Sequence, residues 1–460
     1  MSDKLKIFYV ASEISPFIRV SELSEVAGSL PKYLKNKGHD VRLMMPKYRG
    51  INERKYVLRD VIRLQGLKIK LRGEEFSANG KSAFLPNSKV QVYFLDNREF
   101  FDREDVFAAP ISGEADAERF LFFGIGCLET LKLLYWQPDI IHCNDWQTAF
   151  IPMLLKTLYA KDDFFLNTRT LLSINSPANS AKINKELLKT AGIDIPELKD
   201  ERFNIQDLGL KYADMVSTIS QANSKVLAGA SANGVPVVLP GLDKQVWNPG
   251  EDDLLAVTYT DEDLSGKYKN KTELLNAMEL TGSETDFVLG VVAGSLANET
   301  GSVLMESIPK LLEAGARVAL LAPNSVESKS LDALRKSKPE RFGFHLGYDE
   351  KILHLLKAGC DVLLHLDSAE GGIVNQMQSL CYGTLPIALG KETFNSDTGD
   401  HAFVIKEFST GELLKTVKTA LKRFEDSGNW QGVVASAMNH DYSWEKSTND
   451  YVALYQKLKN

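Results

Sequence analysis

The feature that most constrains the fold is an alternation of short apolar segments with helical patterns, which runs through the 460 residues in two series. Short buried strands joined by helices pair in parallel, which indicates doubly wound α/β sheets. Expected strands are residues 5–10, 41–45, 91–95, 139–142 and 214–219 in the first series, and 287–292, 317–321, 342–346, 362–366 and 384–389 in the second. The pattern predicts two Rossmann-like domains that face each other across a cleft, because ligands bind at the carboxyl ends of such strands.

The domain boundary is expected near residues 248–253, a polar stretch with the composition of a linker. We therefore predict an N-terminal domain at residues 1–245, on the acceptor side, and a C-terminal domain at 246–440, on the nucleotide-sugar side. Residues 441–460 are expected to form a helix that packs back on the protein. Its apolar residues at helical spacing are Tyr451, Leu454, Tyr455 and Leu458.

Composition excludes several classes of partner. The chain has 54 Lys+Arg and 61 Asp+Glu, a net charge of −7, and no basic block, which argues against nucleic acid. No apolar run approaches the roughly 20 residues that span a bilayer, and the chain begins directly with a strand pattern instead of a signal peptide. The expectation is a soluble cytoplasmic protein with no membrane partner.

The cysteines and histidines do not form the pattern of a metal site. The four cysteines lack C-x-x-C spacing and lie in apolar stretches, which favours buried free thiols. None of the seven histidines falls between His142 and His345, so the middle of the chain supplies neither an imidazole base nor a zinc ligand. We predict no metal and no cofactor.

Short motifs spread over nearly the whole chain become specific when their order and spacing are taken together. They are residues 8–17 (FYVASEISPF), 28–31 (GSLP), 38–42 (GHDVR), 46–48 (PKY), 142–148 (HCNDWQT), 247–249 (WNP), 382–386 (YGTLP) and 441–445 (DYSWE). In this order the chain resembles the bacterial glycogen synthases and plant starch synthases, glucosyltransferases of the GT-B fold. The segment at 142–148 is similar to their H-x-H-D-W-H-T motif.

The resemblance implies transfer of glucose from ADP-glucose to the non-reducing end of an α-1,4-glucan, with retention and without an essential metal. The implied ligands are therefore an α-glucan and ADP or ADP-glucose. As the sugar–phosphate bond breaks, charge builds on the leaving diphosphate, and the protein must supply cations and N–H donors. The family does so with a K-T-G-G-L loop at the first helix, and with an Arg and a Lys in an R-L-x-x-Q-K-G loop of the second domain.

The chain departs from the family pattern in the first of these loops, which reads Arg19-Val20-Ser21-Glu22-Leu23. Arg19 keeps the charge of the lysine, although a planar guanidinium does not replace a compact ammonium. A solvated surface charge is the alternative role for Arg19. Glu22 replaces a glycine, and a carboxylate is favoured at a helix N-terminus. The Glu22 carboxylate could therefore occupy the place that a phosphate would take, and the sequence leaves this open.

The second loop and the catalytic histidine also differ. In the segment 293–301, Ser295 aligns with the family arginine and Thr300 with the lysine, while Glu299 adds a negative charge. The family histidine of T-I-H-N, which helps to hold the glucosyl group, becomes Asn175. An amide cannot exchange protons near neutral pH.

Other functional positions are retained. Asp145 survives, Glu370 matches a glutamate near the donor sugar in the family, and residues 382–384 match a segment near the nucleotide. Asp145 with Trp146 has an alternative role in helix capping and the core, and Glu370 as a neighbour of a helix N-cap. The implied catalytic positions are Asp145, Asn175 and Glu370, and the implied nucleotide-sugar or phosphate positions are Arg19, Ser295, Thr300, Tyr382, Gly383 and Thr384.

Two functions therefore stay open. The first is a glycogen or starch synthase-like glucosyltransferase whose activity is weak or lost. The second is a non-catalytic regulator or scaffold that binds a glucan, an active synthase or another copy of itself.

Overall fold

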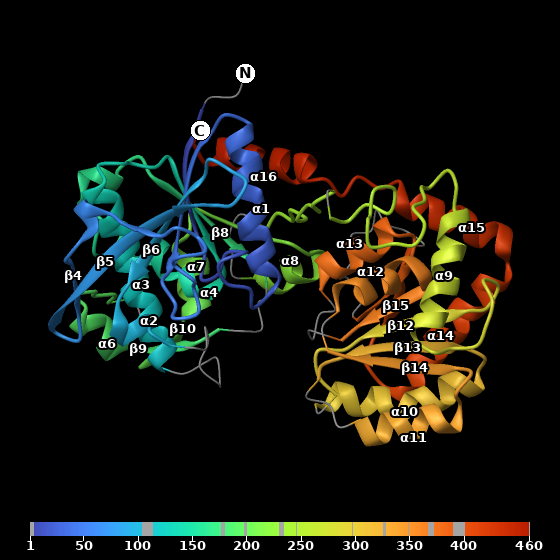
Figure 1. Ribbon diagram of the computed structural model, residues 1–460. Helices are drawn as coiled ribbons and strands as arrows, with labels where there is room; N and C mark the ends of the chain where they lie inside the picture. The colour runs from blue at the N-terminus through green and yellow to red at the C-terminus, as the bar shows by residue number, and fades with distance from the viewer. Residues whose placement is uncertain are drawn as a thin grey trace. The chain divides into compact units, whose positions relative to one another are not determined.

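The computed structural model describes residues 4–103, 114–175, 180–196, 200–229, 234–244, 246–296, 298–324, 328–347, 349–366, 372–389 and 401–459. The chain forms two compact units (Figure 1). Unit 1 contains Met1–Gly241 together with Trp444–Asn460, and unit 2 contains Leu242–Ser443. The α/β class and the parallel sheets that the sequence predicts are confirmed in each unit.

The division between the units differs in detail from the predicted one. It falls between Gly241 and Leu242, four residues before the predicted boundary at 245/246. Residues 248–253 are not a linker, because they belong to unit 2. The Asp252 carboxylate is buried there and accepts hydrogen bonds from His354 Nδ1 at 2.7 Å and from Tyr382 OH at 2.6 Å. The sequence of this stretch has the composition of a linker, because the buried partners of Asp252 lie more than 100 residues further along the chain.

Unit 1 is built on a nine-stranded sheet with the order β11-β8-β7-β1-β2-β6-β5-β3, in which β4 also pairs with β5. The strands from β11 to β6 are parallel, whereas β5 pairs antiparallel with β6, β3 and β4. The strands are β1 Lys6–Val10, β2 Asp40–Pro46, β3 Arg59–Asp60, β4 Leu67–Leu71, β5 Glu74–Phe84, β6 Gln91–Asp96, β7 Ile140–Asn144, β8 Arg169–Ile174 and β11 Met215–Thr218. A separate antiparallel pair consists of β9 Lys182–Asn184 and β10 Arg202–Asn204.

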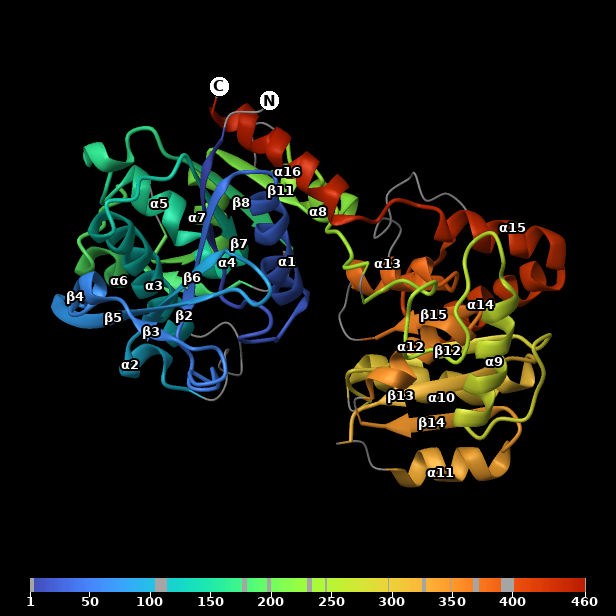
Figure 2. The ribbon, with the colours of Figure 1, turned by 45° about the horizontal axis from the view of Figure 1, so that its top comes forward.

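Helices cover both faces of this sheet. The helices are α1 Glu22–Asn36, α2 Arg98–Phe101, α3 Glu114–Leu133, α4 Asp145–Thr148, α5 Phe150–Lys156, α6 Lys185–Thr190, α7 Ile205–Tyr212, α8 Gln221–Ala228 and α16 Trp444–Lys459. Figure 2 shows α3, α5 and α7 on one side of the sheet and α1 and α16 on the other. In α1 the apolar residues recur at helical spacing and are buried, as expected.

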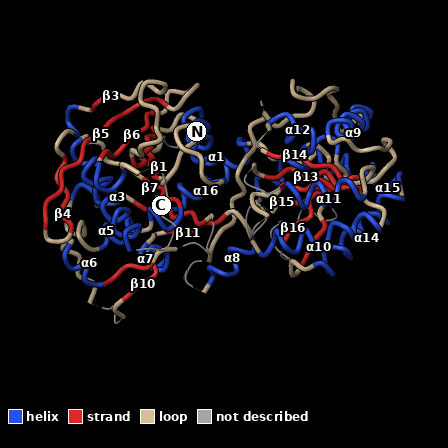
Figure 3. Tube along the Cα trace, turned by 60° about the horizontal axis from the view of Figure 1, so that its bottom comes forward, coloured by secondary structure: helices blue, strands red, loops and turns tan. Residues whose placement is uncertain are grey.

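Unit 2 is built on a six-stranded parallel sheet with the order β14-β13-β12-β15-β16-β17 (Figure 3). The strands are β12 Val288–Val292, β13 Arg317–Ala322, β14 Phe342–Leu346, β15 Val362–His365, β16 Leu385–Leu389 and β17 Phe403–Ile405. The helices are α9 Ser265–Ala277, α10 Glu299–Glu313, α11 Ser328–Ser337, α12 Glu350–Gly359, α13 Ile373–Cys381, α14 Thr410–Glu425 and α15 Ser427–Met438.

Each sheet contains one point where the chain reverses its direction of winding. In unit 1, β1 lies between β2 and β7, and in unit 2, β12 lies between β13 and β15. Crevices outside the carboxyl ends of the strands form at such switch points. By this rule, candidate ligand-binding residues follow β1, β7 and β8 in unit 1, and β12 and β15 in unit 2.

Helix α16 is held to the unit 1 sheet by a buried polar chain. His142 on β7 has Nδ1 2.7 Å from Tyr455 OH and Nε2 2.7 Å from Ser173 Oγ, and Ser173 Oγ lies 2.7 Å from Ser217 Oγ. Burial lowers the pKa of the His142 imidazole to about 3. The neutral ring can donate at one nitrogen and accept at the other, so it satisfies both neighbours.

In unit 2 the buried Lys267 side chain donates hydrogen bonds to the C-terminal ends of two helices. Lys267 Nζ donates to the carbonyl oxygens of Ala358, Cys360 and Tyr382 at 3.0, 3.1 and 3.0 Å and to Thr384 Oγ1 at 2.8 Å. These oxygens lie at the C-terminal ends of α12 and α13 and at the start of β16, where a positive charge is favoured. Burial lowers the pKa of the Lys267 amine to about 7, and the four oxygens replace the water that it loses.

We predict that Lys267→Met lowers the unfolding free energy of unit 2 by about 3 kcal/mol, because it removes the donor that four buried oxygens share. Urea denaturation of the full chain measures this. Lys269→Met on the exposed side of the same helix is the control, and it should change stability by no more than about 0.5 kcal/mol. Equal effects of the two variants would contradict this role of Lys267.

We also predict that His142 makes the fold sensitive to acid. The pKa of the imidazole is near 6.5 in the unfolded state and near 3 in the folded state. Between these pH values the unfolded state binds more protons, so the free energy of unfolding decreases as the pH is lowered. His142→Gln should reduce the loss of unfolding free energy between pH 7.5 and 5.0 by about 2 kcal/mol. Tyr455→Phe keeps the buried imidazole and should keep the pH dependence. An unchanged pH dependence in His142→Gln would refute this prediction.

Candidate active site

The structure brings Asp145 and Asn175 together at the carboxyl edge of the unit 1 sheet. Asp145 follows β7 directly, and Asn175 follows the neighbouring strand β8. Asp145 Oδ1 accepts from the backbone N–H of Asn175 at 2.6 Å, and Oδ2 accepts from Asn175 Nδ2 at 3.2 Å. Asn223 on α8 donates through Nδ2 to the Asn175 carbonyl at 3.0 Å. At the position of the family histidine, the Asn175 side chain is thus held by Asp145 and its backbone by both Asp145 and Asn223.

Asp145 adopts an unusual backbone conformation, with φ of 56°. Residues other than glycine rarely occupy this region, and aspartate and asparagine are among those that tolerate it. The side chain is 9% exposed. A buried carboxylate on a strained turn at a switch point is typical of a functional position, although the Trp146 side chain beside it fills the core against Phe120. Both roles proposed for this segment are therefore compatible with the structure.

A second carboxylate occupies the loop between β1 and α1. Glu13 Oε2 accepts from the backbone N–H groups of Val20 at 2.7 Å and Ser21 at 2.9 Å, and Oε1 accepts from Ser21 Oγ at 2.7 Å. Glu13 is only 1% exposed. Burial raises the pKa of its carboxyl group, the three donors lower it, and the charge of Asp145 raises it further. The edge of the sheet thus carries two acidic side chains near each other.

Arg19 and Glu22 lie on either side of this contact. Arg19 Nε donates to Ser15 Oγ at 3.0 Å and lies 3.4 Å from Glu25 Oε1, with 64% of the side chain exposed. This position fits the alternative of a surface charge, and anion binding by Arg19 stays a prediction. Glu22 is the first residue of α1 and is half-buried. The N–H groups of residues 20 and 21 donate to Glu13. Occupation of a phosphate position by Glu22 stays a prediction.

Amides stand at further positions where the family motif has histidine. Asn144 and Gln147 occupy the second and third histidines of H-x-H-D-W-H-T, in addition to Asn175. Asn144 Oδ1 accepts from Tyr9 OH at 3.0 Å, and its Nδ2 donates to the Val10 carbonyl at 3.0 Å. Glu13, Asn144 and Asn223 were missed as site residues. A residue-by-residue comparison of 142–148 with the motif identifies Asn144, whereas the contacts of Glu13 and Asn223 depend on the fold.

In unit 2, Ser295 and Thr300 lie at the start of α10. Asn298 caps this helix, since its Oδ1 accepts from the Gly301 N–H at 2.8 Å. Gly301 packs against the backbone of Leu296. A Cβ added to Gly301 would lie 2.4 Å from the Leu296 Cα. Ser295 and Thr300 are half-buried on either side of the cap. Both are uncharged, so neither supplies the positive charge of the residue that it replaces.

Residues 382–384 make their described contacts inside unit 2. The Tyr382 hydroxyl donates to Asp252 at 2.6 Å, and Thr384 Oγ1 lies 2.6 Å from the Lys357 carbonyl. Gly383 has φ of 67°, and an added Cβ there would lie 2.7 Å from Val434 Cγ1. All three are buried. Contact of these residues with a nucleotide stays a prediction, and Glu370 lies outside the described residues.

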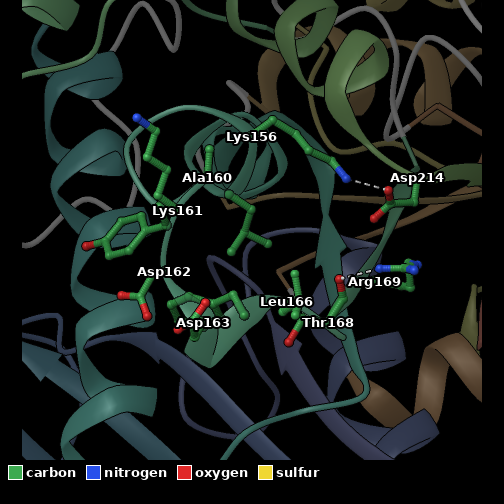
Figure 4. Close-up of a pocket in the computed structure, with 12 residues that line it drawn as sticks. Lys156, Ala160, Lys161, Asp162, Asp163, Leu166, Thr168, Arg169 and Asp214 are labelled. Carbon is green, nitrogen blue, oxygen red and sulfur yellow. Dashed lines mark hydrogen bonds and ion pairs between the residues drawn. The ribbon is translucent and has the colours of Figure 1, made fainter.

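The pocket in Figure 4 is not part of this site. It has a volume of about 250 Å³ and is lined by residues that include Lys156, Arg169 and Asp214. Arg169 begins β8, whereas Asn175 follows the end of β8, so the pocket lies at the opposite edge of the sheet. Lys156 Nζ pairs with Asp214 Oδ1 at 2.8 Å.

The described part of the chain holds neither a cluster of metal-ligating side chains nor a helix that could span a membrane. No group of three or more His, Cys, Asp or Glu side chains in it is placed to hold a metal ion. Among the same residues, no helix combines the length and the apolar character that crossing a membrane requires.

Comparison with known proteins agrees with the motifs. A family model described as the starch synthase catalytic domain matches residues 6–233. The glycogen synthase of Chlorobium phaeovibrioides is 32% identical over 482 residues, and 98% of each chain is covered. The glycogen synthase of Chlorobaculum parvum is 32% identical over 480 residues, again with 98% of each chain covered.

Solved structures share the fold. The catalytic domain of starch synthase IV from Arabidopsis thaliana, bound to ADP and acarbose, matches with a TM-score of 0.83 at 23% identity. The match covers 99% of this chain and 100% of that chain. A sucrose-phosphate synthase from Thermosynechococcus elongatus matches with a TM-score of 0.58 at 12% identity, covering 99% of each chain.

We predict that Asp145→Ala destabilises unit 1 by about 2 kcal/mol, because it removes two hydrogen bonds and leaves an alanine at positive φ. Asp145→Asn is the matched variant. Asparagine tolerates this conformation, and its oxygen can still accept from the Asn175 N–H. Its effect should be below about 1 kcal/mol. Urea denaturation compares the two, and an equal loss in both would contradict the role assigned to the backbone conformation.

Proposed function

Because the chain belongs to the glycogen synthase and starch synthase family of GT-B glycosyltransferases, we propose that it is a glucan-binding member with weak or lost transfer of glucose from ADP-glucose. The observation that carries the proposal is the chemistry at the carboxyl edge of the unit 1 sheet. Glu13 and Asp145 present carboxylates there, and Asn175 is held by Asp145 at the position of the family histidine.

The chain lacks several groups that a diphosphate leaving group requires. Without a metal, the negative charge that develops on the diphosphate must be met by fixed cations and N–H groups. Ser295 and Thr300 stand at two positions where the family pattern has cations, and Arg19 lies beside Glu25. Loss of one such donor reduces the rate by about 10²–10³-fold.

The half-buried Asn175 amide is suited to a neutral sugar. Side-chain amides both donate and accept hydrogen bonds, as sugar hydroxyls do. A starch synthase with this fold was solved with ADP and acarbose, which supports a nucleotide and an oligosaccharide as the ligands to test. The proposal is that this chain has retained the binding of oligosaccharides to a greater extent than the binding of nucleotides.

We predict incorporation of glucose from ADP-glucose into glycogen at a rate at least about 10²-fold below that of a synthase with the family residues. Incorporation of radiolabelled glucose measures this. Calorimetric binding of maltohexaose to the same preparation should persist. The combined substitutions Ser295→Arg and Thr300→Lys should raise incorporation.

Three outcomes separate the candidate functions. Incorporation at the rate of a full synthase would refute loss of activity. Absence of both incorporation and maltohexaose binding would refute a glucan-binding role. Binding without incorporation is the expected result, and it leaves open the regulatory form of the proposal, in which the partner is an active synthase.

A further inference from the structure

The loop before α1 satisfies most of its own N–H groups. The N–H groups of Val20 and Ser21 donate to Glu13, that of Leu23 donates to Ser21 Oγ at 3.3 Å, and that of Ser24 donates to the Ser21 carbonyl at 3.1 Å. Phosphates bind at helix N-termini because such N–H groups point at the ligand without another partner. Four of these donors at residues 20–24 already have acceptors within the chain.

Ser21 is the centre of this arrangement. Its hydroxyl donates to Glu13 Oε1 at 2.7 Å and accepts from the Leu23 N–H. Its carbonyl accepts from the Ser24 hydroxyl at 2.7 Å. The backbone of Ser21 is extended, with φ of −136° and ψ of 179°, which any residue can adopt. The hydroxyl is therefore the part of Ser21 that a substitution removes without changing the path of the chain.

The carboxylate of Glu13 completes the closure of the loop. It is 1% exposed and has three donors within 2.9 Å. An ionised group that is removed from water persists only where hydrogen bonds replace its hydration. Those donors cannot serve a second anion at the same time, and two negative charges at one position repel each other.

We propose that Ser21 and Glu13 form a specificity-determining pair that closes this loop to the phosphates of a nucleoside diphosphate. The pair acts by internal hydrogen bonding and is separate from the loss of cations in unit 2. The inference rests on the proposed function, because it concerns the same edge of the sheet. It names the residues that decide between a neutral sugar and a phosphorylated ligand there.

Hydrogen bonds and packing around the loop hold it in this hydrogen-bonded conformation. The Ser15 N–H donates to the Ser24 carbonyl at 2.9 Å, and Gly28 lies against Ser15, where an added Cβ would be 2.6 Å from the Ser15 carbonyl oxygen. Arg19 is tied to Ser15 as well. The loop is therefore attached to α1 at several points, and removal of the Ser21 hydroxyl releases the Leu23 N–H while these attachments remain.

The experiment measures calorimetric binding of ADP and adenosine to the full chain and to Ser21→Gly and Ser21→Ala. Both variants should bind ADP at least about tenfold more tightly than the unmodified chain, the effect expected for regaining a hydrogen bond to a charged ligand. Adenosine affinity should change by less than about twofold, because adenosine has no phosphate. The same pair of measurements in a Glu22→Gly background removes the negative charge next to Ser21.

Ser24→Ala is the matched control. It removes a hydroxyl from the same turn that donates only to the Ser21 carbonyl, so the donors bound by Glu13 and by Ser21 Oγ are unaffected. It should leave ADP affinity unchanged. Helix-capping losses differ between the Ser21 variants, since glycine is a better N-cap residue than alanine. A cooperative unfolding transition for each variant shows that the comparison concerns folded protein.

Each outcome decides the inference. Tighter ADP binding by both Ser21 variants with unchanged adenosine binding supports it. Unchanged ADP binding in both backgrounds overturns it, and so does an equal gain for adenosine. A gain confined to Ser21→Gly assigns the effect to chain flexibility and also overturns the role of the hydroxyl. Failure here leaves the low transfer rate of the unmodified chain untouched, so the two proposals fail separately.

Discussion

Hydrogen bonding of buried charges to the backbone is the constraint on which both units depend. In unit 1 the Glu13 carboxylate joins the residues after β1 to the start of α1. In unit 2 the Lys267 ammonium joins α9 to the ends of α12 and α13. Such groups persist in the interior only with several partners. Glu13 therefore fixes the turn between β1 and α1, and Lys267 fixes the relative position of segments that are distant in the sequence.

The strands were predictable where apolar residues form continuous runs. All ten expected strands are present, since segments such as Val362–His365 consist of buried residues only. β8 was missed, because it begins with the polar pair Arg169-Thr170. β5 was missed as well, because an antiparallel strand with polar residues such as Glu74 and Lys81 has no apolar run.

The candidate site was less accessible from the sequence than the fold. Asp145 and Asn175 were named from motifs, and only the pairing of β7 with β8 shows that they are hydrogen-bonded. Glu13 was part of a recognised motif, but its partners lie seven and eight residues later. Asp252 was assigned to a linker, since nothing in the sequence indicates that His354 lies beside it. Contacts between distant residues depend on topology, which local patterns do not encode.

The return of the chain to unit 1 has a consequence for biosynthesis. Helix α16 supplies Trp444, Tyr451 and Tyr455 to the core of the first unit, after the whole of unit 2 has been made. Domains fold as they emerge during synthesis. Unit 2 is thus the first part that can reach its complete native state on the ribosome, while the sheet face that α1 covers stays incomplete until α16 has been synthesised.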